Sequence, residues 1–453
     1  MTQTKHDFTE GPLLKKMLLF SGPIFLANLL QASYQIIDSL WVGNLLGAAA
    51  LAAVALSATL TFTVLSFIIG MNRASLTILS QQKGSNDTAR LRESLNAFVV
   101  VLGGLSLLLA AAGFTFVRPL LSWLGSPPAV TPLAESYLQL TFLGIPFLFG
   151  YNFISTVLRS LGDSKTPVRF VVLAVVLNAA FDPLFISVAN LGIAGAALAT
   201  VLSQGIAFGC GLAHCLNGRR VPFTVPHLPE RKFLRAIFKL GIPGGLQMVS
   251  ISAGSAAIVG VAAAFGPTVL AGYGASQRIS RLVMMVLMTL STAMNSMAGQ
   301  NIGAGRWDRV RKLRNDGLLV MFAASLTVSA FVFGLAKPLV GLFVDDAATI
   351  NFGADYLRAV VFFYPFLGIN FVLNGIVRGA GAMVSVLLLN LISFWILRFP
   401  LSALFSHWMG AVGIAYGIGT SFVMSSMIAA CYFRYGRWRE VEIFAPNEDM
   451  ASK

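Results

Sequence analysis

The sequence predicts an all-α membrane protein in which twelve transmembrane helices form two six-helix bundles. A pseudo-two-fold axis along the membrane normal is expected to relate the two bundles. Three observations lead to this fold class: the composition, a series of long apolar runs and an internal repeat. Of the 453 residues, 56% are hydrophobic and only 11% are charged, whereas soluble domains carry about 25% charged residues. A water-soluble core of this size cannot bury so much apolar surface.

Spanning helices are predicted wherever about 20 predominantly apolar residues follow one another, because that length crosses the hydrocarbon core. Strands of a membrane barrel need only about 9–11 residues, and the runs here are far longer and continuous. The first run is also too long for a signal peptide and is therefore predicted to be retained. The predicted spans are 16–43, 49–80, 93–118, 132–158, 168–188, 192–216, 236–264, 268–298, 313–337, 352–376, 382–405 and 411–434.

The net charge of +14 comes from basic clusters that lie between apolar runs rather than on one basic face. These clusters occupy 83–92, 159–169, 219–239, 306–314 and 434–439. Cytoplasmic loops of membrane proteins are enriched in Lys and Arg. The distribution therefore places both termini in the cytoplasm of a bacterial-type inner (plasma) membrane, and it argues against binding of nucleic acid.

No sequence pattern indicates an enzyme. The three cysteines, Cys210, Cys215 and Cys431, lie in or beside apolar runs and are not paired at metal-ligand spacing, so neither a disulfide framework nor a zinc site is predicted. No nucleophile–base pair, phosphate-binding loop or metal cluster is visible. We therefore expect no enzymatic activity, no metal and no cofactor.

The chain repeats itself at an offset near 219 residues. SQQKGSNDTARLRESL (80–95) matches GQNIGAGRWDRVRKLR (299–314), YLQLTFLGIPF (137–147) matches YLRAVVFFYPF (356–366), and Pro23 pairs with Pro243. Each repeat has an even number of spans, so both copies have the same orientation, as in many transporters that bind substrate near the midplane. The predicted domains are an N-terminal lobe at 1–216, a cytoplasmic linker at 217–235 and a C-terminal lobe at 236–453.

Only two acidic residues, Asp38 and Asp182, fall well within predicted spans. A charge at mid-bilayer costs about 2.5–3.5 kcal/mol on insertion scales, so such a residue is by default a functional hypothesis. The repeat places Ile258 and Phe399 at the equivalent positions of the second half. Because the fold does not need acids there, both carboxylates point to a function of the N-terminal lobe.

Helical spacing predicts polar stripes around these two acids. Gln31, Tyr34, Gln35 and Asp38 follow an i, i+3, i+4, i+7 pattern, Asn178 and Asp182 are i, i+4, and so are Thr200 and Gln204. Polar groups in hydrocarbon need partners, so the stripes are expected to face one another or water. Desolvation favours the neutral form of a carboxyl group, which suits a proton carrier. Oxygen ligands from Asn178 and Thr200 would equally suit Na⁺. The alternative is a purely structural Asn178–Asp182 hydrogen bond at a Pro-kinked helix.

The chain resembles the multidrug and toxic compound extrusion (MATE) transporters over nearly its whole length. The resemblance lies in the first-span pattern SGPIFLANLLQASYQIIDSLWVGNLLG (21–47) and in the Gln and Gly ahead of a basic cluster in both halves. NAAFDPLF (178–185) is similar to the fifth-span signature of the DinF-like branch. Another branch carries a carboxylate after a Gly-x-Pro in the seventh span. GIPGGLQMVSISAG (241–254) has none, so the resemblance implies a coupling site in the N-terminal lobe only.

The resemblance also implies roles for individual residues. Asp38 matches the first-span acid implicated in coupling, and Asp182 and Asn178 match the fifth-span acid and amide. Asn152 and Thr200 match further polar members of that network. Tyr34 and Gln31 are added to the substrate-lining network from periodicity alone, and Pro23 is the expected hinge of the first span.

The resemblance implies cation-coupled export of amphipathic, often cationic organic compounds. Together with the buried acids, it predicts a monomeric antiporter that exports such compounds and drugs in exchange for protons by alternating access, among membrane lipids. One alternative is Na⁺ coupling, with the ion at Asp38, Asp182, Asn178 and Thr200. Another is a flippase of lipid-linked oligosaccharides with the same superfamily architecture. A flippase for pyrophosphate headgroups needs a cationic lumen, whereas the first-span stripe is neutral to acidic, so a cationic cargo is favoured.

Overall fold

The computed structural model describes residues 7–217 and 221–444, and every regular element in these residues is helical. The residues outside this part include the predicted linker residues 218–220, with Arg219 and Arg220, and both termini, 1–6 and 445–453. The predicted all-α fold class is therefore confirmed for the described chain.

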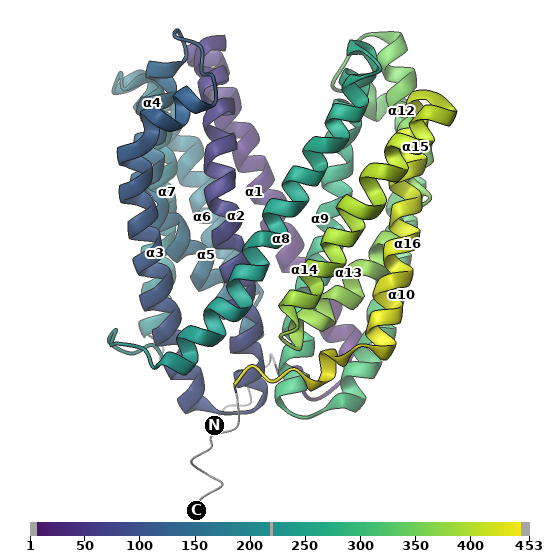
Figure 1. The fold of residues 1–453 in the computed structure, drawn as a ribbon. Helices are drawn as coiled ribbons and strands as arrows, with labels where there is room; N and C mark the ends of the chain where they lie inside the picture. The colour runs from purple at the N-terminus through teal and green to yellow at the C-terminus, as the bar shows by residue number, and fades with distance from the viewer. Residues whose placement is uncertain (1–6, 218–220, 445–453) are drawn as a thin grey trace, which may run out of the picture. The chain divides into compact units, whose positions relative to one another are not determined.

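The helices of the first half follow the predicted spans closely (Figure 1). They are α1 (Leu13–Leu46), α2 (Ala48–Gly84), α3 (Thr88–Trp123), α4 (Thr131–Leu143), α5 (Ile145–Ser160), α6 (Lys165–Pro183), the π-helix η1 (Leu184–Val188) and α7 (Gly192–Asn217).

The second half repeats this order with additional short elements. They are α8 (Arg231–Ala263), α9 (Pro267–Gly303), α10 (Trp307–Gly334), α11 (Ala336–Gly341), α12 (Ala347–Val361), α13 (Tyr364–Gly379), α14 (Met383–Leu391), the π-helix η2 (Ile392–Arg398), α15 (Phe399–Met409), η3 (Gly410–Val412), α16 (Gly413–Tyr435) and η4 (Arg437–Glu440).

Two predicted spans, 132–158 and 352–376, are bent rather than straight. The axes of α4 and α5 meet at 48°, and those of α12 and α13 meet at 52°. In each pair the second helix has a proline in its first turn, Pro146 or Pro365. Proline fits the first turn of a helix, but its ring disfavours helical geometry for the residue before it. The break between two helices is therefore present at the same place in both copies of the repeat.

By length and composition, residues 7–217 and 221–444 contain nine helices able to cross a membrane, or eleven when each bent pair counts as one span. One of these, the stretch Met383–Tyr435, has 53 residues and would be about 80 Å long as one helix, against a hydrocarbon core of about 30 Å. It divides at Gly410, where φ is +69°, and α15 packs against α16. With this stretch counted as two spans, the described chain fits the predicted twelve.

The chain forms two compact units, and each includes a segment that belongs by sequence to the other half of the chain. One unit contains Gly22–Gly241, and the other contains Phe8–Ser21 together with the residues from Ile242 onward. Helix α1 therefore passes from one unit to the other directly before Pro23, and α8 does so directly before Pro243. The predicted lobe boundaries at 216 and 236 stay a prediction, because the compact units divide at different residues.

The segment before α1 is held by side chains from the second half. The backbone N–H of Phe8 donates to Gln300 Oε1 at 3.2 Å, and Asn301 Nδ2 donates to the Phe8 carbonyl at 3.2 Å. Arg309 Nη2 donates to the carbonyls of Phe8, Glu10 and Gly11, each at 3.0 Å. One guanidinium thus holds three backbone carbonyls within residues 8–11, in the same compact unit.

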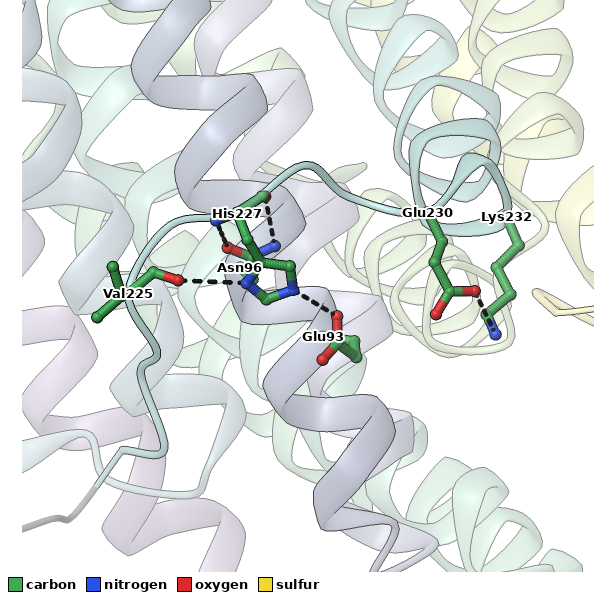
Figure 2. Close-up of polar contacts among 6 residues, drawn as sticks. All are labelled: Glu93, Asn96, Val225, His227, Glu230 and Lys232. Carbon is green, nitrogen blue, oxygen red and sulfur yellow. Dashed lines mark hydrogen bonds and ion pairs between the residues drawn. The ribbon is translucent and has the colours of Figure 1, made fainter.

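The segment before α8 is held in a similar way by α3 (Figure 2). Asn96 Nδ2 donates to the His227 carbonyl at 2.9 Å, and the His227 backbone N–H donates to Asn96 Oδ1 at 3.0 Å. The imidazole of His227 also lies 3.1 Å from Glu93 Oε2. Hydrogen bonds to the Val225 carbonyl and to Glu93 raise the pKa of His227 above its ordinary value. Phe8 and His227 are equivalent positions of the repeat, and the backbone N–H and carbonyl of each bond to side-chain amides: those of Gln300 and Asn301 for Phe8, and that of Asn96 alone for His227.

Candidate functional site

The first acid of the site, Asp38, comes from the C-terminal half of α1. Its side chain is buried, with 7% of its surface exposed, and Tyr34 one turn earlier is half-buried. Gln31 and Gln35 are exposed, although helical spacing places them on the same stripe. The stripe therefore divides: Asp38 and Tyr34 are buried or half-buried, whereas Gln31 and Gln35 keep exposed side chains.

The second acid, Asp182, lies at the end of α6 and is fully buried together with Asn178. Asn178 Nδ2 donates to Asp182 Oδ1 at 3.1 Å within the helix and to Thr200 Oγ1 of α7 at 3.5 Å. The predicted i, i+4 pair is thus present, and the amide connects it to the neighbouring helix. The second contact is long and correspondingly weak.

A tyrosine connects the α1 side of the site to α7. The Tyr34 hydroxyl lies 3.4 Å from Ser203 Oγ, and Ser203 Oγ donates to the Thr200 carbonyl at 3.0 Å. Asp38 interacts electrostatically with Asp182, and both acids interact with Tyr137 of α4. Helices α1, α4, α6 and α7 therefore all contribute to one polar cluster, which we call the N-lobe cluster: Tyr34, Asp38, Tyr137, Asn178, Asp182, Thr200 and Ser203.

Three oxygen atoms in the N-lobe cluster are buried and have no hydrogen-bond donor among the described residues: Asp38 Oδ1, Asn178 Oδ1 and Asp182 Oδ2. A buried polar atom without a partner costs about 1–3 kcal/mol. A proton on either carboxyl group, or a cation bound among the three oxygens, would reduce this cost. The carbonyl oxygen of an amide and the oxygens of two carboxyl groups are acceptors that suit either species.

Not every predicted residue joins this cluster. Asn152 donates to the Leu148 carbonyl of its own helix at 2.8 Å, and no contact with either acid is recorded. Gln31 lies near the Tyr151 hydroxyl of α5 instead. Tyr137 and Ser203 were missed as site residues, because one occupies an exposed-looking span end and the other only neighbours Thr200 in sequence.

The backbone after Asp182 departs from α-helical geometry. Pro183 follows the acid, and residues Leu184–Val188 form the π-helix η1, which closes with a bond from Ala189 N–H to the Leu184 carbonyl at 2.8 Å. Proline lacks the N–H that the preceding turn needs, and π-turns are frequent at functional sites. The second half has a π-helix, η2, in its corresponding span, so this irregularity also belongs to the repeat.

Comparison with known proteins finds the same family in both halves of the chain. The family model MatE matches residues 23–184 and again residues 243–404. The chain belongs to the MatE family. The two matches to this family begin at Pro23 and Pro243, which supports the duplication inferred from the sequence. The assignment of this MatE chain to the DinF-like branch stays a prediction.

Among the relatives of this MatE chain is the probable multidrug resistance protein YpnP of Bacillus subtilis. It is 54% identical over 439 residues, covering 97% of this chain and 99% of YpnP. The multidrug export protein MepA of Staphylococcus aureus is 25% identical over 426 residues, covering 91% and 92% of the two chains.

A solved structure of a MATE multidrug resistance transporter in an outward-facing conformation has the same fold. It superimposes with a TM-score of 0.90 at 22% identity, covering 97% of this chain and all of that one.

Proposed function

We propose that this protein is a multidrug efflux antiporter that exports amphipathic, mostly cationic organic compounds in exchange for protons. Membership of the MatE family and the names of YpnP and MepA support drug export. The N-lobe cluster supports coupling to a cation, because it contains both buried acids of the chain's spans. Transport rather than enzymatic catalysis is the activity that these features favour.

One observation carries the coupling proposal: Asp38 Oδ1 and Asp182 Oδ2 are buried carboxyl oxygens without hydrogen-bond donors in the described chain. A structural carboxylate is normally satisfied by several donors, since burial of an unpaired charge is costly. A carboxyl group that gains and loses a proton instead needs a free oxygen. We therefore assign the proton to Asp38, with Asp182 and Asn178 as its partners in the cluster.

The transport cycle follows from charge. Ionised Asp38 attracts the cationic cargo while the protein is open to the cytoplasm. After the change to the outward-open state, protonation of Asp38 removes that charge and releases the cargo. Proton entry gains about 2.3 kcal/mol per charge for each 100 mV of membrane potential. The position of Pro23, directly where α1 passes between the compact units, suits the hinge of this change, because an internal proline weakens the helix at that turn.

Sodium is the alternative coupling ion. The oxygens of Asp38, Asp182, Asn178 and Thr200 are of the type that hard cations prefer. Two carboxyl groups suit a single proton or a weakly held monovalent ion. Dye-loaded proteoliposomes given either a pH gradient or a Na⁺ gradient distinguish the two ions, and export driven by Na⁺ alone would refute proton coupling.

The direct test is Asp38→Asn. The amide keeps the size of the side chain but cannot ionise, so we expect normal membrane insertion and loss of export of a cationic dye, by at least about tenfold. The matched control is Asp345→Asn, which removes an exposed acid from the loop before α12 and should leave export unchanged. Wild-type drug resistance in cells that carry Asp38→Asn would show that the assignment is wrong.

The proposed setting is the inner (plasma) membrane of a bacterium, with both termini in the cytoplasm and the protein acting as a monomer. A flippase of lipid-linked oligosaccharides remains the rival in the same fold. The two acids of the N-lobe cluster disfavour it, because they repel a pyrophosphate headgroup.

A further inference from the structure

The second half contains a buried arginine that the coupling mechanism does not use. Arg398 lies at the end of η2, inside the span Met383–Met409, and only 9% of its surface is exposed. The repeat places it next to Phe399, the equivalent of Asp182. An arginine inside a membrane span is costly and is by default a functional hypothesis.

The contacts of Arg398 leave most of its donors without a partner. Its guanidinium lies 3.7 Å from the ring centre of Phe394 and 4.8 Å from that of Phe422. Its Nε donates to Ser421 Oγ at 3.4 Å. Among the described residues, no acceptor is recorded for Nη1 or Nη2, and no carboxylate forms an ion pair with this arginine. A guanidinium has five N–H donors, so this side chain has unused capacity for an anion.

Aromatic and polar side chains surround this position within the same compact unit. The Tyr364 ring packs against Phe422 at 6.5 Å, and the Tyr364 hydroxyl lies 2.9 Å from Ser280 Oγ. Tyr273 and Tyr356 pack edge to face at 5.3 Å, and both interact electrostatically with Arg398. We call this set the C-lobe aromatic cluster: Tyr273, Tyr356, Tyr364, Phe394, Arg398 and Phe422.

The chemistry of the C-lobe aromatic cluster selects a class of ligand. A single guanidinium compensates one negative charge, and in the described chain no second cation is recorded over these rings. Two rings already lie over or beside the guanidinium plane, and aromatic surfaces favour a planar aromatic ligand. The bidentate geometry of arginine matches a carboxylate or a similar flat anion. A dianionic phosphate would lack a second positive partner.

We propose that the C-lobe aromatic cluster is a binding site for an aromatic monoanion, with Arg398 receiving the carboxylate or equivalent group. The site extends the range of ligands to anionic and zwitterionic aromatic compounds. Its use for cargo rests on the proposed export function, whereas the binding itself does not. The competing explanation is that Arg398 only braces η2 against α16 through the two phenylalanine rings.

Two matched probes distinguish these explanations: 1-naphthoate and its neutral analogue 1-naphthamide. They share a ring system, so stacking on aromatic side chains is similar and the difference between their affinities reports the charge, while their different partition into lipid is removed by the protein-free control. Binding is measured with the full-length protein in nanodiscs by equilibrium dialysis, with protein-free nanodiscs subtracted. We expect the wild type to bind naphthoate about tenfold or more tightly than naphthamide, the size of one charge-assisted hydrogen-bonded pair.

The variant Arg398→Met should abolish this preference. Methionine keeps an unbranched side chain between the two rings, and replacement of a buried ion by an apolar side chain is often tolerated. Arg398→Lys keeps the charge without the planar fork and should retain a reduced preference. The control is Arg278→Gln, because Arg278 is exposed and also lies over a ring, that of Phe343 at 5.3 Å. It should bind both probes as the wild type does.

Equal affinities of the wild type for the two probes would overturn the proposal without reference to any variant. Retention of the preference for naphthoate in Arg398→Met would also overturn the proposal, since another residue would then bind the carboxylate. Because the assay measures binding only, a failure of the export function leaves its result unchanged.

Discussion

Replacement of Asn178 tests the polar network that joins α6 to α7. Asn178→Ala removes the donor that serves Asp182 Oδ1 at 3.1 Å and Thr200 Oγ1 at 3.5 Å. Because Asp182 is fully buried and its Oδ2 already lacks a donor in the described chain, the variant leaves the whole carboxyl group without one. The variant therefore separates the energetic role of the amide from that of the acid.

The two bonds differ in their expected contributions. Hydrogen bonds between membrane helices contribute about 0.6 kcal/mol on average and up to about 1.7 kcal/mol, and the contact with Thr200 is long. Leaving a buried acceptor without a donor costs about 1–3 kcal/mol. We therefore expect Asn178→Ala to lower the free energy of unfolding by about 2 kcal/mol, or about 30-fold in the equilibrium constant. Thr200→Val, which keeps the shape of the side chain, should lower it by about 0.6 kcal/mol or less.

The assay is reversible unfolding by sodium dodecyl sulfate in mixed micelles, followed by circular dichroism. The double variant should be destabilised by less than the sum of the two single variants, because the contact between Asn178 and Thr200 is lost only once; such non-additivity is the mark of a shared bond. The network does not hold the two helices as described if the free energy of unfolding of Asn178→Ala lies within about 0.5 kcal/mol of the wild-type value. The same follows if Thr200→Val is destabilised as much as Asn178→Ala.

The two segments held before α1 and α8 give further predictions. Arg309→Ala removes three bonds to the carbonyls of residues 8–11 and should increase hydrogen exchange there severalfold, whereas Arg311→Ala, on the exposed side of α10, should not; unchanged exchange in Arg309→Ala would contradict the contact. The pKa of His227 is raised above its ordinary value of 6.5, so the stabilisation from its charged contacts is present below that value and is lost as pH rises through the raised one. Exchange of residues 221–230, corrected for intrinsic rates, should therefore increase with pH in the wild type, and His227→Gln should remove that dependence; an identical pH profile in both proteins would show that the imidazole does not hold the segment.

The spans could be predicted from sequence because the apolar requirement of the bilayer acts on each residue locally. Predicted 192–216 and observed Gly192–Asn217 agree almost residue by residue. The bends at Pro146 and Pro365 were missed, because a proline in an apolar run is compatible with a kinked helix as well as with a new one. The membership of Phe8–Ser21 in the compact unit of the second half was missed for another reason. Its partners Gln300, Asn301 and Arg309 lie almost 300 positions away in the sequence.

The two acids could be singled out because an ionisable group stands out against an apolar run, and the repeat showed that the fold does not require them. Periodicity was less informative about their neighbours. It grouped Gln35 with Asp38, although only Asp38 is buried, because a stripe does not say which of its edges faces the protein. Tyr137 lay outside the reach of periodicity, since it joins the cluster from α4. Roles in transport for Asp38, Asp182, Asn178 and Thr200 stay predictions until the variants are measured.

The reciprocal borrowing of first-helix segments has a consequence for the integrity of the protein. If the chain were cut within the linker, the N-terminal fragment would contain Phe8–Ser21, which belongs to the compact unit of the second half. The C-terminal fragment would contain Val221–Gly241, which belongs to the compact unit of the first half. Neither fragment contains all the parts of a finished bundle. To assemble, each fragment would have to supply its segment to the compact unit of the other fragment. The repeat therefore forms two mutually dependent halves rather than two that fold independently.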